Sequence, residues 1–266
     1  MTGEVENFLR VFFVGGLTSY RALFNWISPW VFFPILVIYP VFQILFFAYL
    51  GRYAHAQSDA FFLIGNTFIA VAVTGFFGMG NSVANERRSQ TLPSVLASPA
   101  NRLALFLGRA LPSIVTGFVV AAISFAIGAT LLHVHVGARE IGALSVAVLA
   151  SSFACTAFGL CLGALGLRGR NVGLFADTVS GCMLLVAGAN VPLARLPGWI
   201  QGLASVLPLT HGIQAARRVG GGESLGAAGG LLATELVIGV IYLVAGLGLL
   251  RLFEYEGRRT ATLETF

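Results

Sequence analysis

The sequence predicts an all-α, polytopic membrane protein, and three observations support that prediction. The 266 residues are 57% hydrophobic and only 10% charged, whereas soluble domains carry about 25% charged residues. The mean hydropathy of the chain is +0.86. Apolar stretches of about 20 residues, the length that crosses a bilayer as a helix, recur along the sequence. We therefore expect one membrane domain that covers residues 1–266, with no soluble domain attached.

Six apolar stretches are candidates for membrane spans. They cover residues 30–50, 60–80, 111–132, 141–165, 172–191 and 227–250. Residues 1–24 differ, because their apolar residues recur at helical spacing with acidic and polar residues between them. That pattern is typical of a helix that lies in the membrane interface. The alternative is a soluble amphipathic helix packed on a partner.

The arginines predict the orientation of the spans. Six spans would place eleven arginines on the side that carries both termini (Arg10, Arg21, Arg87, Arg88, Arg102, Arg109, Arg168, Arg170, Arg251, Arg258 and Arg259). Five would lie on the other side (Arg52, Arg139, Arg195, Arg217 and Arg218). Because basic residues accumulate in cytoplasmic loops, we expect a multi-pass protein of the cell (inner or plasma) membrane with both termini in the cytoplasm.

The segment 192–217, before the last span, contains two apolar-patterned pieces of about ten residues separated by Pro208. Trp199, Leu203 and Val206 share one helical face of the first piece. Each piece is too short to cross the bilayer, but such backbone is tolerated where protein or water covers it. We expect two short, re-entrant extracellular helices; the alternative is a plain extracellular loop.

The stretch 85–109 is the most polar long run in the chain, and its part 85–103 contains a short apolar-patterned core. Thr91 is a suitable N-cap, and Pro93 falls in the first turn, where its missing N–H costs nothing. One face of the helix would carry Leu92, Val95, Leu96 and Pro99. A helix of about two turns is marginal alone in water, so it needs a partner. The residues leave open whether that partner is the membrane surface or a groove on a cytoplasmic protein.

Two motifs carry a resemblance to a known family. The first is N-E-R-x-x-x-T-L-x-x-x-L-x-S-P from Asn85 to Pro99, followed by Gly108 and Arg109. The second is N-x-P-x-x-x-L-P-x-W-I, followed by L-P-L-T-H, between Asn190 and His211. Together they resemble the signature of the ABC-2 type transporter permeases, the membrane subunits of drug, antibiotic, lipid-linked glycan and nodulation-factor exporters. The resemblance covers essentially the whole chain, with Gln90 at a position where the family usually has glycine.

The resemblance implies a coupling helix that seats in a separate ABC ATPase subunit. Its residues would be Glu86, Arg87, Arg88, Thr91, Leu92, Val95, Leu96 and Pro99. It also implies two ATPase subunits and a second copy of this chain or a similar permease, with a path for the substrate between the two permeases. ATP and Mg²⁺ would be bound by the partner ATPase, and we expect no cofactor in this chain.

The composition agrees with an ATPase site that lies in a separate subunit. The chain contains no lysine, and a phosphate-binding G-x-x-x-x-G-K-[ST] loop requires one. No metalloprotease or hydrolase motif is present, so we expect a transport subunit and not an enzyme. In a chain this apolar, the net charge of +5 does not indicate a nucleic acid partner; the surrounding partner is the lipid bilayer.

Two acidic residues fall inside predicted spans, Asp177 in the fifth and Glu235 near the middle of the sixth. A buried carboxylate costs about 2.5–3.5 kcal/mol on insertion scales, so each must face protein, water or a partner. We predict that both line the substrate path, together with Phe46 from the aromatic first span. The alternative for both is an internal hydrogen bond, or, for Asp177, an arginine partner such as Arg168 or Arg170.

These observations predict the permease subunit of an ATP-driven exporter that moves a hydrophobic drug, antibiotic, lipid or lipid-linked glycan out of the cytoplasm or the inner leaflet. The alternative is a secondary transporter driven by an ion gradient, with Asp177 or Glu235 as the coupling site. That alternative predicts matching carboxylates in two inverted repeats, and the sequence shows no such symmetry.

Overall fold

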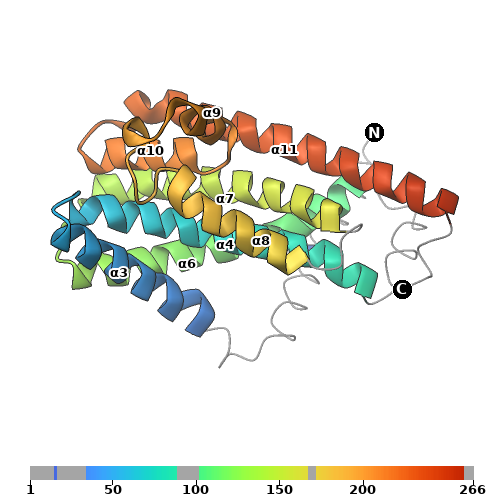
Figure 1. Cartoon of the computed structure of the whole chain (residues 1–266), viewed down its shortest axis with the longest axis horizontal. Coiled ribbons are helices and arrows are strands. Elements are labelled where there is room, and N and C mark those ends of the chain that lie inside the picture. The colour runs from blue at the N-terminus through green and yellow to red at the C-terminus, as the bar shows by residue number, and fades with distance from the viewer. Residues whose placement is uncertain (1–14, 17–33, 89–101, 167–171, 261–266) are drawn as a thin grey trace.

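The computed structural model describes residues 15–16, 34–88, 102–166 and 172–260, and every regular element in these ranges is a helix. The long helices are α3 (Tyr39–Tyr53), α4 (Asp59–Arg88), α6 (Arg102–Leu131), α7 (Ala138–Gly166), α8 (Val172–Val186) and α11 (Leu225–Thr260). The short elements are η1 (Pro34–Ile38), η2 (Leu193–Arg195), α9 (Gly198–Val206) and α10 (Thr210–Gly220). The long helices lie side by side in one bundle (Figure 1). The prediction of an all-α fold is confirmed for the described residues.

Five helical segments in the described part of the chain are long and apolar enough to cross a membrane. They are Pro34–Tyr53, Asp59–Gly80, Gly108–Leu131, Ala138–Leu165 and Leu225–Phe253. Each coincides with a predicted span. The remaining predicted span, 172–191, corresponds to α8, which has 15 residues and a length of about 22 Å at 1.5 Å per residue, against about 30 Å of hydrocarbon. The count of six spans therefore stays a prediction.

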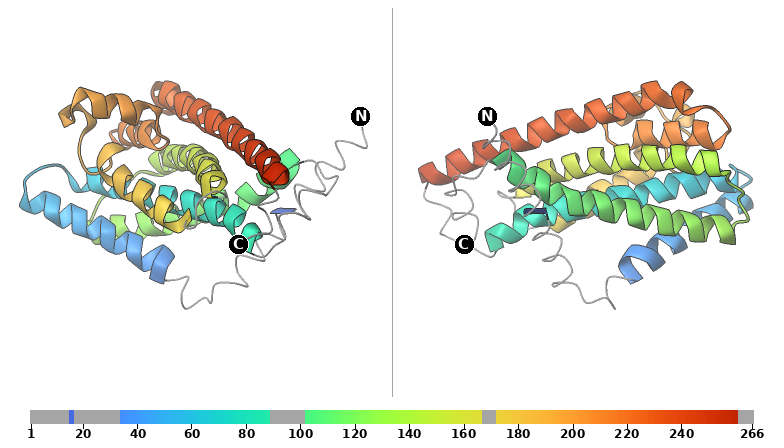
Figure 2. Two further views of the ribbon diagram at one scale, coloured as in Figure 1. Left: turned by 45° about the vertical axis from the view of Figure 1, so that its right-hand side comes forward. Right: turned by 180° about the vertical axis from the view of Figure 1, so that it is seen from behind.

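Helices α4 and α7 form the centre of the bundle. Of the most apolar stretch of each helix, 78% is buried inside the bundle, whereas the value for α11 is 22%. Helix α11 lies along one side of the bundle in both views of Figure 2. The backbones of α4 and α7 approach closely at two glycines: a Cβ added to Gly159 would lie 2.5 Å from the carbonyl oxygen of Gly75. Small residues permit such close approach between membrane helices. The spacing of Gly159 and Gly163 predicts close helix packing within one subunit, and the structure confirms it at Gly159.

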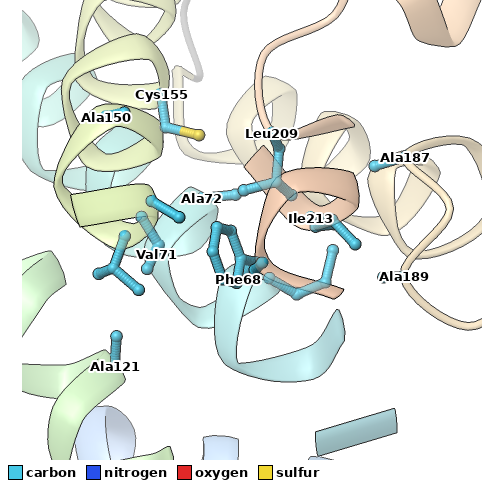
Figure 3. Close-up of a cluster of buried hydrophobic side chains, with 14 of the residues drawn as sticks. Phe68, Val71, Ala72, Ala121, Ala150, Cys155, Ala187, Ala189, Leu209 and Ile213 are labelled. Atoms are coloured by element: carbon cyan, nitrogen blue, oxygen red, sulfur yellow. The ribbon is translucent and has the colours of Figure 1, made fainter. Parts of the chain in front are cut away.

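The short helix α10 contributes to the main core. Leu209, just before α10, and Ile213 are fully buried beside Phe68 of α4, and Cys155 of α7 belongs to the same cluster (Figure 3). The buried residues of α10 are Thr210, Gly212, Ile213, Ala215, Ala216 and Val219. A plain loop would expose its backbone to solvent, whereas this segment is a helix packed inside the fold.

The second short helix, α9, packs differently. Trp199, Leu203 and Val206, predicted on one face, are 74%, 47% and 56% exposed. Pro208 lies in the turn between α9 and α10, where it cannot continue a helix. The prediction of two short helices before the last span is confirmed, and their depth in a membrane stays a prediction. We refer to the end of the bundle that holds α9 and α10 as the α10 end (Figure 1).

At the opposite end the helices extend beyond their predicted limits. Helix α4 continues to Arg88 and α6 begins at Arg102, so both edges of the predicted coupling region 85–103 belong to long helices. The reason is that residues 81–88 contain no proline or glycine to end α4. Residues 89–101 lie outside the described residues, as does the predicted interfacial helix 1–24 apart from Gly15 and Gly16.

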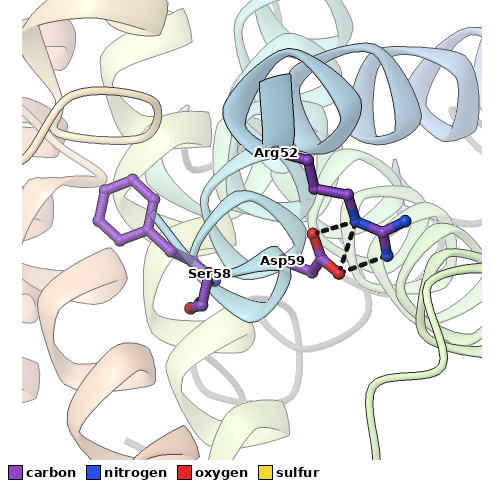
Figure 4. Close-up of polar contacts among 4 residues, drawn as sticks. Arg52, Ser58 and Asp59 are labelled. Atoms are coloured by element: carbon purple, nitrogen blue, oxygen red, sulfur yellow. Dashed lines mark hydrogen bonds and ion pairs between the residues drawn. The ribbon is translucent and has the colours of Figure 1, made fainter. Parts of the chain in front are cut away.

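Helices α3 and α4 are joined by a short turn whose ends are tied together. Arg52 near the end of α3 donates from Nε to both carboxylate oxygens of Asp59, at 2.9 and 3.1 Å (Figure 4). Ser58 accepts a hydrogen bond from the N–H of Phe61 at 3.4 Å and so caps the first turn of α4. These contacts hold α3 against α4 at the α10 end.

Candidate functional site

The predicted coupling residues divide between two parts of the chain. Glu86, Arg87 and Arg88 form the last turn of α4. The other members lie outside the described residues, namely Thr91, Leu92, Val95, Leu96 and Pro99. Helices α4 and α6, which flank this segment, both reach the end of the bundle opposite α9 and α10 (Figure 1). The coupling helix itself stays a prediction.

Phe46 lies on an exposed aromatic face of α3. It is 62% exposed, and its ring contacts that of Phe47 in an edge-to-face arrangement, with centroids 5.3 Å apart. The same face carries the exposed residues Tyr39, Phe42, Tyr49 and Tyr53. The opposite face packs against α4 through Ile44 and Ala48. Helix α3 therefore presents a broad aromatic surface that the described residues leave exposed.

Asp177 lies on the exposed face of α8. The same exposed face carries the apolar side chains of Leu174, Phe175 and Leu185, which are 63%, 60% and 61% exposed. It also carries Thr178, whose hydroxyl donates to the carbonyl oxygen of Leu174 at 2.7 Å. Within the described residues no hydrogen bond or ion pair involves Asp177. Arg168 and Arg170, which the sequence offers as partners, lie outside the described residues. A carboxylate on an apolar helix is expensive against lipid, so this side chain requires water, another protein chain or an arginine of its own chain.

Glu235 has the opposite environment. It is fully buried in α11, and its two carboxylate oxygens accept hydrogen bonds from backbone N–H groups at the start of α10. Oε1 accepts from Leu209 at 2.6 Å, and Oε2 accepts from Gly212 at 3.1 Å. The first N–H groups of a helix have no partner within the helix and carry a partial positive charge. The carboxylate therefore caps α10 from a different helix and has no exposed surface for a ligand.

This capping coincides with a strained backbone. Leu209 has φ of +88°, and a side chain in such a conformation costs about 1–3 kcal/mol. The hydrogen bond from Leu209 to Glu235 and the burial of the leucine side chain stabilise that conformation. The sequence reveals a glutamate in an apolar run but gives no sign that backbone amides would satisfy it.

The other end of α10 is held by a partly buried arginine. Arg217 donates to the carbonyl oxygens of Gly188 and Ala189, each at 2.7 Å, and to that of Phe61 at 3.2 Å. Burial lowers the pKa of Arg217 to about 9, so the guanidinium stays charged at neutral pH. Helix α10 is thereby tied to α4 and to the connection after α8. In the sequence, Arg217 is only one of the five arginines on the side opposite the termini, and nothing there predicts these contacts.

A polar chain links three elements near the same end. Gln43 of α3 donates to the side-chain oxygen of Asn66 at 3.2 Å, and Asn66 of α4 donates to that of Asn190 at 2.8 Å. Asn66 also donates to the carbonyl of Phe62 at 2.9 Å. Amides inside apolar helices are the signal that points to such a network, because each needs a partner in the membrane. The signal is visible in the sequence as Gln43, Asn66 and Asn190 within or next to apolar stretches.

The fold and these contacts define a multi-pass helical membrane protein in which two charged groups, Glu235 and Arg217, tie the short helix α10 to the rest of the bundle. Comparison with known families also indicates a membrane protein. The profile of the family described as "ABC-2 type transporter" matches residues 17–219. The chain belongs to the ABC-2 type transporter family, whose members are membrane subunits with the ATPase activity in separate subunits.

Two curated relatives are similar over part of the chain. Both are described as "Probable multidrug ABC transporter permease YbhR", one from Escherichia coli strain K12 and the other from E. coli O157:H7. Each is 26% identical over 132 residues, which is 49% of this chain and 35% of the relative. The aligned part thus covers about a third of the length of these relatives.

Proposed function

We propose that the chain is the permease subunit of an ABC exporter that acts as a pair of permeases above two ATPase subunits. The pair, made of two copies or of this chain and a similar one, moves a hydrophobic compound outward. Both termini and the segment 85–103 face the cytoplasm, as the distribution of arginines predicts. The α10 end then faces outward. Family membership supports the pairing with an ATPase.

The observation that carries the proposal is the exposed carboxylate of Asp177 on a largely apolar face of α8. A face turned to lipid would not keep a carboxylate without a partner. A face turned to a water-filled path between two permeases satisfies it. Helix α3, with the exposed ring of Phe46, packs against α4 as α8 does, so both helices flank the same central helix.

The aromatic face of α3 supports a hydrophobic substrate. Exposed aromatic rings offer large apolar contact area. The stretch from Tyr39 to Tyr49 contains no charged residue. The description of the relatives as multidrug permeases points in the same direction. A drug, an antibiotic or a lipid therefore fits the described surface better than a bare polysaccharide.

The proposal is tested by co-purifying the chain with a candidate ABC ATPase from the same genome. Leu96→Asp places a charge on the apolar face of the predicted coupling helix, whereas Ser94→Asp places it on another face of the same turn. We expect Leu96→Asp to abolish binding of the ATPase and Ser94→Asp to preserve it, with both variants inserted in the membrane. Retained binding and ATP-dependent transport in Leu96→Asp would disprove the coupling assignment.

A further measurement separates the exporter from a secondary transporter. We expect uptake of a hydrophobic dye into inverted vesicles to require ATP and to persist when an ionophore collapses the proton gradient. Uptake that follows the gradient and ignores ATP would favour the ion-driven alternative.

A further inference from the structure

Helix α10 connects two parts of the bundle through two separate charged anchors. Glu235 joins its beginning to α11, and Arg217 joins its end to α4 and to the connection after α8. Any displacement of α11 relative to α4 must therefore be taken up at α10, either by moving α10 or by breaking one anchor.

Helix α11 is suited to carry movement along the molecule. It has 36 residues and a length of about 54 Å at 1.5 Å per residue. It runs from the α10 end to the opposite end of the bundle (Figures 1 and 2). Glu235 lies in its first third, on the side that packs against α10 and α7. One residue thus fixes α10 to a helix that reaches both ends of the fold.

We propose that Glu235 is a positioning residue for transport, which makes α10 move with α11 when ATP hydrolysis displaces that helix. Movement of α10 opens or closes the α10 end of the path. This inference rests on the proposed function, because it needs an ATPase that displaces α11. It differs from the sequence-based prediction that Glu235 contacts substrate, since both carboxylate oxygens bind backbone amides and the side chain is fully buried.

The geometry explains why a glutamate serves here. Two N–H groups near the first turn of α10, on Leu209 and Gly212, point at one carboxylate. A glutamine would offer one acceptor oxygen and turn its NH₂ group toward the second N–H. It would also remove the negative charge from the positive end of the helix. Glu235→Gln therefore loosens the anchor while preserving the size of the side chain.

The experiment is hydrogen exchange, measured by mass spectrometry, on the chain bound to its ABC ATPase in lipid nanodiscs. Peptides covering 207–216 report on α10, and peptides covering 225–235 report on the start of α11. Each is measured without nucleotide and with ATP plus vanadate, which traps the ATPase. Glu223→Gln is the matched control, because Glu223 is an exposed glutamate in the connection between α10 and α11.

In the wild type and in Glu223→Gln we expect ATP plus vanadate to change the exchange of both peptides together. In Glu235→Gln we expect 207–216 to exchange at least about tenfold faster without nucleotide, because a charged hydrogen-bonded anchor is lost. We also expect this peptide to lose its response to ATP while 225–235 keeps its own. A role limited to stability would raise the exchange rate but leave the nucleotide response in place.

Three results would overturn the inference. One is unchanged exchange of 207–216 in Glu235→Gln, and another is a nucleotide response of this peptide that persists in the variant. The third needs no variant and applies even if Glu235→Gln does not fold: in the wild-type complex, 225–235 responds to ATP and 207–216 does not. If the wild-type complex shows no response in any peptide, the proposed function fails and the inference with it.

Discussion

The guanidinium carbon of Arg217 lies 3.4 Å from the centroid of the Phe61 ring, and the same side chain donates to the carbonyl oxygen of Phe61 at 3.2 Å. Arg217 lies in α10 and Phe61 in the first turn of α4, 156 residues earlier. The charge on the arginine is thus balanced by a ring face and carbonyl dipoles, with no carboxylate among its described hydrogen-bond partners. This contact fixes a short helix to the central helix of the bundle.

Arg217→Met should destabilise the protein, because it leaves three carbonyl oxygens without their charged donor. Hydrogen bonds to charged groups contribute about 1.5–3 kcal/mol each, so we expect the apparent melting temperature in detergent to fall by at least about 5 °C. Arg218→Met is the control, because Arg218 is exposed, and its melting temperature should match the wild type. Equal melting temperatures for both variants would contradict the role of Arg217.

Gly212→Ala should disturb the packing of α10 against α7. A Cβ at this position would clash with Oγ of Ser151 and lie 3.2 Å from the ring of Phe68. We expect a loss of about 1–3 kcal/mol from overpacking, measured by thermal unfolding, and partial recovery when Ser151→Ala removes the hydroxyl. Gly202→Ala in α9 meets no atom within 4 Å and should leave stability unchanged or slightly raised. A tolerated Gly212→Ala would show that α10 packs elsewhere.

Gly159→Ala should prevent the close approach of α7 to α4. Its Cβ would meet the carbonyl oxygen of Gly75 at 2.5 Å and Cα of Phe76 at 3.1 Å, and backbone atoms cannot rotate away as a side chain can. We expect little monodisperse protein after size-exclusion chromatography. Gly142→Ala in the same helix meets open space and should yield normal amounts. Comparable yields for the two variants would refute the tight α4–α7 contact.

The three cysteines should react differently with a hydrophilic maleimide in native membranes. Cys182 lies on the exposed face of α8, whereas Cys155 and Cys161 are buried. If this face lines a water-filled path, Cys182 should label and the other two should not, and Cys182→Ser should abolish labelling. A cysteine placed at Val244, which is 65% exposed on α11, reports on a lipid-facing surface and should stay unlabelled. Equal protection of both positions would place α8 against lipid.

The sequence predicted much of the architecture, because the cost of burying backbone and charge in a membrane leaves a direct mark on composition. Apolar length located the five segments that the structure supports as spans. Pro208, between two pieces too short to cross, located α9 and α10. The limits of α4 and α6 at the opposite end were less accurate, because the polar residues beyond a membrane boundary do not stop a helix.

What the sequence alone determined is therefore the set of helices, their approximate bounds and the family to which the chain belongs. The tertiary structure decided what the charged residues do. Asp177 and Glu235 are each a carboxylate in an apolar run, yet one is exposed on α8 and the other is buried against α10. The partners of Glu235 are backbone N–H groups 26 and 23 residues away. Every residue except proline carries such a group, so only the packing of α10 against α11 determines which of them meet the carboxylate.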